Sequence, residues 1–147
     1  LQLFKGLSDN FQSQIKLWIK PHPATNVSPI QILIQQDLSP NFDYALIFSP
    51  LSSVIPKMNC LATNASSVAL EAIAYGIPVV MCGNANWVTH NTIPEMIRAQ
   101  CSLNAMTAEE LECAILSLTS QNKLQEKPIN IFHKTTQSDI KKLFLKK

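Results

Sequence analysis

The sequence predicts an α/β fold, namely a Rossmann-like, doubly wound parallel sheet of about five strands with helices on both faces. Short apolar segments that do not alternate polar with apolar residues are typical of strands covered on both sides. Two such segments, 58–63 and 78–82, flank a segment of helical periodicity, and other strand-like segments alternate with helical ones along the 147 residues. Strands that alternate with helices favour a parallel sheet, whose ligands bind beyond the carboxyl ends of the strands. This length predicts about one domain, 1–147.

The first third of the chain contains apolar spacing and breakers that define alternating elements. Leu and Phe residues recur at helical spacing before residue 12, and three prolines lie between positions 21 and 29. Proline clusters predict loops, and proline suits the first position of a helix. The expected elements are a helix over 1–12, a strand over 15–20, a loop over 21–29, a helix over 29–38, a strand over 44–48 and a short helix over 50–58, kinked or stopped near Pro56.

Residues 60–82 are the most informative segment, because they predict a strand–turn–helix–turn–strand unit. Two apolar runs, 58–63 and 78–82, flank a helix expected over 67–75. This helix is apolar nearly all round, which indicates burial on several sides. Gly76 suits the left-handed position after a helix, and Pro78 cannot continue it.

The last third of the chain combines a polar loop with one strongly marked helix. Thr107 is a capping residue and Glu110, three residues later, completes a capping box. The expected elements are a polar loop over 83–92, a helix over 93–99 with Pro94 in its first turn, a strand over 101–103, a helix over 107–119, a polar and weakly ordered stretch over 120–136, and a basic amphipathic C-terminal helix over 137–147.

The composition limits the class of protein. A hydrophobic fraction of 46% supports a sizeable core, whereas charged residues make up only 15%, against an average of about 25%. The low charge indicates that part of the surface meets another domain. A net charge of +2 is too small to indicate nucleic-acid binding. Because the chain starts at Leu1 without Met, we expect a fragment of a longer two-domain chain.

The cysteines and histidines show no spacing typical of a metal site or a disulfide framework. The four cysteines are far apart and form no Cys-x-x-Cys motif. They are expected to be buried, reduced thiols of a cytoplasmic protein. No metal is expected. The residues concerned are Cys60, Cys82, Cys101, Cys113, His22, His90 and His133.

The turn before the helix in 60–82 carries candidate ligand-binding groups: Asn64, Ser66 and Ser67. A helix start beyond the end of a buried strand favours anions, because free N–H groups and the macrodipole point at the ligand. Glu71 is a lone carboxylate one turn into the helix, and a buried charge needs partners. It suits ribose hydroxyls. The other interpretation is dipole stabilisation or an ion pair with a lysine.

Two further groups are expected at the same edge of the sheet. His22 lies between two prolines directly after the first strand, so its backbone is held rigidly where it could donate a hydrogen bond to a phosphate. Asn84, Asn86 and His90 crowd the loop after the strand that ends at Cys82, and their side chains suit sugar hydroxyls. The alternatives are a histidine that caps a nearby helix and a turn with Asn in left-handed positions.

The His22-Pro23 pair and the Ser66-Ser67 motif, followed by Glu71, Gly76 and Pro78, resemble the C-terminal, donor nucleotide-binding half of GT-B glycosyltransferases. The resemblance is strongest to enzymes of bacterial surface and capsular polysaccharide biosynthesis, namely sialyl- and Kdo-transferases and related glycerophosphotransferases. It covers residues 13–119.

This resemblance implies sugar transfer from a CMP- or UDP-linked donor to a surface glycan acceptor. His22 would stabilise the leaving-group phosphate as the catalytic residue. Ser66 and Ser67 would bind that phosphate, and Glu71 would hold the donor ribose. The resemblance implies no cofactor or metal beyond the nucleotide-sugar substrate. It implies an N-terminal GT-B half as partner, a cytoplasmic location at the inner face of the bacterial membrane, and no activity for this half alone.

Other interpretations stay open. The basic helix over 137–147 would cross to the N-terminal half, lie on an anionic membrane surface, or form a solvated tail. A sugar-nucleotide epimerase shares the GT-B architecture but needs acid and base carboxylates, for which Glu71 and Glu95 are the nearby candidates. A non-catalytic nucleotide-sugar-binding module would use the same donor groups.

Overall fold

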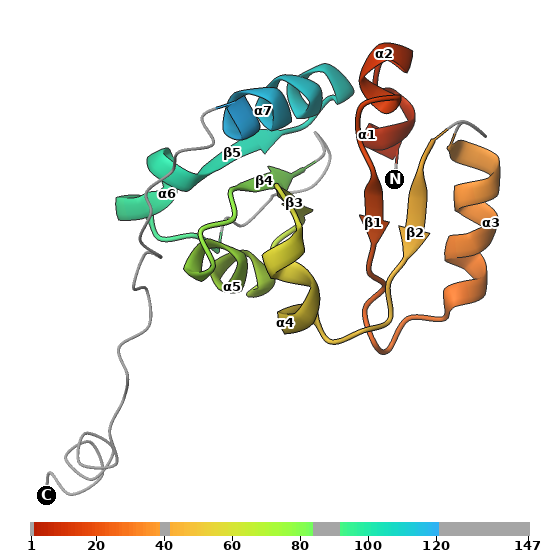
Figure 1. The fold of residues 1–147 in the computed structure, drawn as a ribbon, viewed down its shortest axis with the longest axis horizontal. Helices are drawn as coiled ribbons and strands as arrows, with labels where there is room; N and C mark the ends of the chain where they lie inside the picture. Colours follow the sequence, from red (N-terminus) through yellow and green to blue (C-terminus); the bar gives the residue numbers. More distant parts are fainter. Residues whose placement is uncertain (1, 39–41, 84–91, 121–147) are drawn as a thin grey trace, which may run out of the picture.

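The protein has an α/β structure with parallel strands (Figure 1). The computed structural model describes residues 2–38, 42–83 and 92–120. In these ranges the strands are β1 (Leu17–Ile19), β2 (Tyr44–Leu46), β3 (Leu61–Thr63), β4 (Val79–Cys82) and β5 (Ser102–Ala105). The helices are α1 (Gln2–Lys5), α2 (Asp9–Gln12), α3 (Val27–Asp37), α4 (Leu51–Val54), the 3-10 turn η1 (Ile55–Lys57), α5 (Val68–Ala74), α6 (Glu95–Cys101) and α7 (Ala108–Ser120).

The strands form two separate parallel sheets. β1 pairs with β2, with Leu17 opposite Tyr44. In the second sheet the order is β3-β4-β5, and Val79 of β4 lies between Leu61 of β3 and Ser102 of β5. The predicted α/β class and the parallel strands are therefore confirmed. The single sheet that was expected is not: hydrogen bonds join the described strands into one two-stranded and one three-stranded sheet. In Figure 1, β1 stands between β2 and the three-stranded sheet.

The central strand β4 is covered on both faces. Val80 packs in one core cluster with Ala105 and α7 residues, whereas Val79 and Met81 pack in a second cluster with residues of α5. This division follows from the alternation of side chains along a strand. The three β4 side chains are at most 1% exposed. The expectation of helices on both faces is thus met at the three-stranded sheet.

The two sheets share one hydrophobic core. Leu17 and Ile19 of β1 and Leu46 of β2 pack against the same cluster as Val80 and Ala62 of the three-stranded sheet. Phe11 of α2 is 4% exposed and belongs to this cluster. Burial of apolar side chains at roughly 25 cal/mol per Å² therefore holds the sheets together, although no ladder joins them in the described chain.

The predicted turn at Gly76 is confirmed. Gly76 has a φ of 76°, a left-handed conformation that favours glycine. Its N–H donates to the carbonyl of Ile73 (2.9 Å), and the N–H of Ile77 donates to the carbonyl of Ala72 (3.0 Å). These two bonds form a Schellman motif, which ends α5 and turns the chain into β4.

Two helix predictions near the N-terminus are wrong. The single helix expected over 1–12 is broken into α1 and α2, because Ser8 caps α2 by accepting from the N–H of Phe11 (3.3 Å). The helix expected to begin at Pro29 begins at Val27. The side chain of Asn26 accepts from the N–H of Ser28 (3.1 Å) and caps it two residues earlier.

Boundaries near the C-terminal end of the described chain also shift, while the capping box holds. The helix expected over 93–99 is α6, and the following strand starts at Ser102, so Cys101 is helical. The N–H of Glu110 donates to Thr107 Oγ1 (3.2 Å) and Glu110 Oε2 accepts from the N–H of Thr107 (3.4 Å), as predicted. The expected basic helix over 137–147 lies outside the described residues.

Candidate functional site

The turn between β3 and α5 carries polar groups at the carboxyl end of β3. Asn64 and Ser67 are exposed, and Ser66 is half-buried. Asn64 Oδ1 accepts from the N–H of Ala65 (2.8 Å), and Ser66 Oγ accepts from the N–H of Val68 (3.3 Å). Ser66 therefore satisfies the first helical amide, while Ser67 makes no capping bond with its side chain. Among the described residues, the Ser67 hydroxyl has no hydrogen-bond partner.

Most amides at the start of α5 are already used within the protein. The N–H of Ala69 donates to the carbonyl of Ser66 (3.2 Å), and the N–H of Leu70 donates to that of Ser67 (3.0 Å). Within residues 2–38, 42–83 and 92–120, the N–H groups of Ser66 and Ser67 have no hydrogen-bond partner. Because α5 has only seven residues, its dipole is a small contribution. Among the described residues, the donors without an acceptor at this turn include these two N–H groups and the hydroxyl protons of Ser66 and Ser67.

Glu71 lies in the first turn of α5, where its N–H donates to the carbonyl of Ser67 (3.4 Å). Its side chain is half-buried, whereas Ala69, Ala72 and Ile73 of the same helix are buried in the core. In the part of the chain that the structure describes, the Glu71 carboxylate has neither a hydrogen bond nor an ion pair. The lysine partner considered as the alternative is therefore absent from the described residues.

His22 follows β1 through Lys20 and Pro21. Its side chain is exposed, and Nδ1 accepts from the N–H of Ala24 (3.2 Å) while its carbonyl accepts from the N–H of Thr25 (2.8 Å). An accepting Nδ1 places the proton of the neutral ring on Nε2, so Nε2 is a donor. The predicted role of His22, to donate a hydrogen bond to a phosphate, stays a prediction. The alternative was a histidine that caps a nearby helix. In the structure, the His22 side chain instead accepts from an N–H of its own turn.

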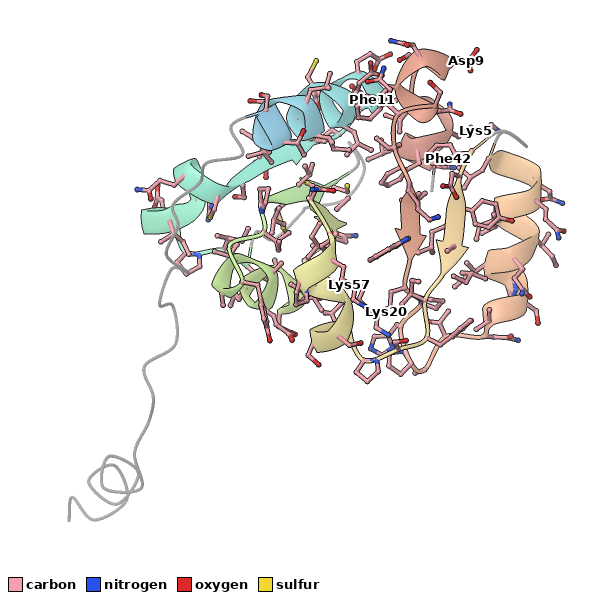
Figure 2. All side chains as sticks on the ribbon, viewed as in Figure 1. Lys5, Asp9, Phe11, Lys20, Phe42 and Lys57 are labelled. Atoms are coloured by element: carbon pink, nitrogen blue, oxygen red, sulfur yellow. The ribbon has the colours of Figure 1, made fainter. Side chains whose placement is uncertain are left out.

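Lys20 was not singled out by the sequence, because a lone lysine at the end of a strand carries no local signal. Its Nζ donates to the carbonyl of Ser49 (2.7 Å) and so ties the carboxyl ends of β1 and β2 together. Figure 2 shows Lys20 where β1 leads into the loop toward α3. This hydrogen bond fixes the point from which the chain continues to His22.

The two groups of candidate residues are held by different sheets. His22 follows a strand of the two-stranded sheet, and Ser66 and Ser67 follow a strand of the three-stranded sheet. None of the hydrogen bonds between described residues joins His22 to Ser66, Ser67 or Glu71. The structure thus brings Ser66, Ser67 and Glu71 together on one turn, and places His22 in a loop with its own contacts.

The predicted loop side chains of Asn84, Asn86 and His90 lie outside the described residues. The residues on either side of them are described. The N–H of Gly83 donates to the carbonyl of Ala105 (2.8 Å), and Thr92 Oγ1 donates to the carbonyl of Ser66 (3.0 Å). Gly83 is therefore held at the end of β5, and Thr92 is held at the β3–α5 turn.

The cysteines are free thiols, as predicted. Burial, followed by the neighbouring Cys82, raises the pKa of Cys60 to about 12. Burial also raises the pKa of Cys82 and of Cys101. These three thiols therefore stay protonated near neutral pH and are poor nucleophiles. The prediction of burial is confirmed for Cys101, whereas Cys60 and Cys82 are half-buried, and it is wrong for Cys113, which is exposed on α7.

Within the described ranges, no three His, Cys, Asp or Glu side chains gather in a way that would hold a metal ion. The helices of the same ranges are all too short or too polar to cross a membrane. In comparisons with known proteins, no family model, no curated protein and no solved structure matches the chain.

Proposed function

We propose that this chain is the donor-binding domain of a glycosyltransferase, which moves a sugar from a CMP- or UDP-linked donor to a surface glycan acceptor. One observation carries the proposal. The Ser67 hydroxyl and the N–H groups of Ser66 and Ser67 have no hydrogen-bond partner among the described residues, one helical turn before the unpaired carboxylate of Glu71. Donors for a phosphate and an acceptor for ribose hydroxyls thus share one turn of the chain.

The finer fold in this proposal is a single Rossmann-like sheet with the strand order β2-β1-β3-β4-β5. The shared core and the position of β1 in Figure 1 support this order. In such a sheet the chain proceeds from β1 outward to β2 and then crosses to β3, and ligands bind where the order reverses. His22 follows β1 and Ser66 follows β3, so both would border that point.

The contribution of this domain to catalysis would be to stabilise the leaving nucleotide. Negative charge grows on its phosphate as the sugar departs, and donors fixed in advance stabilise that charge. Loss of one such donor typically lowers the rate by about 10²–10³. The proposal assigns this work to the Ser67 hydroxyl, the two serine N–H groups and Nε2 of His22. The base that activates the acceptor would lie in an N-terminal half.

The test is a titration of the 147-residue chain with CMP, CDP, UMP and UDP, followed by NMR. We expect saturable shifts centred on Ser66, Ser67 and Glu71. Ser67→Ala should weaken binding by about tenfold or more, because a hydrogen bond to a charged group contributes about 1.5–3 kcal/mol. Ser52→Ala is the matched control, since Ser52 is an exposed serine of α4. The absence of saturable shifts with all four nucleotides contradicts the proposal.

A further inference from the structure

Thr92 makes a side-chain contact that joins two connections of the three-stranded sheet. Its Oγ1 donates to the carbonyl of Ser66 at 3.0 Å, across 26 residues of sequence, and the bond is partly buried. The same carbonyl accepts from the N–H of Ala69 (3.2 Å). The Ser66 peptide is therefore held from α5 and from the segment that leads into α6.

The residue after Thr92 fixes the position of its hydroxyl. Ile93 is 1% exposed and packs in the core cluster that contains Ala69 and Ile73 of α5. The guanidinium of Arg98 donates twice to the carbonyl of Ile93, from Nη2 (2.9 Å) and Nε (3.3 Å). Ile93 is held by the core and by α6. The backbone next to Thr92 is therefore fixed at the position from which its hydroxyl contacts Ser66.

We propose that Thr92 is a positioning residue for the phosphate-binding turn. Its hydroxyl holds the Ser66 carbonyl, which orients the flanking N–H groups of Ser66 and Ser67 toward a nucleotide phosphate. This inference rests on the proposed donor-binding function. Ser66 and Ser67 would touch the ligand, and Thr92 would act through them, because its own hydroxyl proton is used in the bond to Ser66.

The experiment compares Thr92→Val, which removes the hydroxyl at nearly constant volume, with Thr92→Ser, which keeps it. Thr119→Val is the matched control, because Thr119 Oγ1 donates to the carbonyl of Ile115 (2.7 Å) within α7. Dissociation constants for CMP, CDP, UMP and UDP are measured by NMR titration. Amide hydrogen exchange of Val68 and Ala69 is recorded without ligand.

Thr92→Val should weaken nucleotide binding by about fivefold, since one intramolecular hydrogen bond is worth about 1 kcal/mol. It should also accelerate exchange of Val68 and Ala69 by a similar factor. Thr92→Ser should restore both values to within about twofold of the parent, on the same reasoning. Thr119→Val should change neither. Should Thr92→Val not fold, Thr92→Ala replaces it in the same comparison.

The outcomes separate this inference from the function on which it rests. If the parent chain binds none of the nucleotides, the donor-binding function fails, and hydrogen exchange alone decides whether Thr92 orders the turn. If the parent binds and Thr92→Val binds equally well, the positioning role is overturned. Unchanged exchange of Val68 and Ala69 in Thr92→Val overturns it in either case.

Discussion

Ser8 and Glu112 connect the N-terminal helices to α7 through two hydrogen bonds. The N–H of Ser8 donates to Glu112 Oε2 (3.1 Å), and the Ser8 hydroxyl donates to Oε1 (2.9 Å). The same hydroxyl oxygen accepts from the N–H of Phe11 (3.3 Å), so the carboxylate orients the cap of α2. Phe11 lies between α2 and α7 in Figure 2 and packs with Leu111 in one cluster. Polar and apolar contacts thus fix the same helix.

Replacing Glu112 with Ala should lower the free energy of unfolding by about 1 kcal/mol, because both hydrogen bonds to Ser8 are lost. Ser8→Ala should cost about 1 kcal/mol, since it also removes the cap of α2. Urea denaturation of both variants and of the double variant measures the coupling. The double variant should lose less than the sum of the single losses, because the two residues share their bonds. Strictly additive losses would show that the contact contributes nothing.

Gly6 allows α1 to approach α7 closely. A Cβ atom built on Gly6 would lie 2.8 Å from the Cβ of Ala108, well inside contact distance. Gly6→Ala should therefore destabilise the protein by about 1–3 kcal/mol, as overpacking does. The change is measured by urea or thermal denaturation. Ala108→Gly, combined with Gly6→Ala, should recover most of the loss, because it removes the opposing atom. A Gly6→Ala variant as stable as the parent would show that the helices separate without cost.

Features encoded by neighbouring residues could be predicted from the sequence. The Thr107–Glu110 capping box and the left-handed Gly76 depend on residues within one helical turn. The burial of β4 is indicated by its own apolar composition. The cap at Asn26 is also local, but the proline at position 29 was the stronger start signal and displaced the predicted boundary.

Contacts between distant residues could not be predicted. Thr92 with Ser66 and Lys20 with Ser49 are single hydrogen bonds set by the tertiary fold, and neither residue type nor spacing indicates them. The division of the strands into two sheets has the same origin. Apolar runs identify strands, but hydrogen-bond pairing depends on how the shared core places β1 beside its neighbours.

Cys60 should make the free energy of unfolding fall as the pH rises above 9. Burial, reinforced by Cys82, raises its pKa from 9.0 to about 12, so the folded chain keeps a proton that the unfolded chain loses. The resulting stabilisation is complete below pH 9 and is lost as pH rises from 9 toward 12, by up to about 1.4 kcal/mol per pH unit. Urea denaturation at pH 8 and pH 10 measures the slope.

Cys60→Ala provides the comparison for that slope. The variant should lose less stability between pH 8 and pH 10 than the parent, whatever its stability at pH 8. Equal slopes would mean that the Cys60 thiol titrates alike in the folded and unfolded chains. Alkylation at pH 8 gives an independent check, because the exposed Cys113 should react first and Cys60 only after denaturant is added.

Glu71 should recognise the ribose and not the phosphate. Its half-buried carboxylate has no hydrogen-bond partner in the described ranges, so Glu71→Gln removes charge without breaking a contact between described residues. If the carboxylate accepts from ribose hydroxyls, Glu71→Gln should weaken UMP binding by about tenfold or more. Binding of 2′,3′-dideoxy-UMP should stay nearly unchanged, because that analogue lacks the hydroxyl donors. Glu95→Gln is the matched control, since Glu95 is an exposed glutamate in the first turn of α6. Equal losses for both nucleotides would assign Glu71 a structural role, and no loss for UMP would remove it from the binding site.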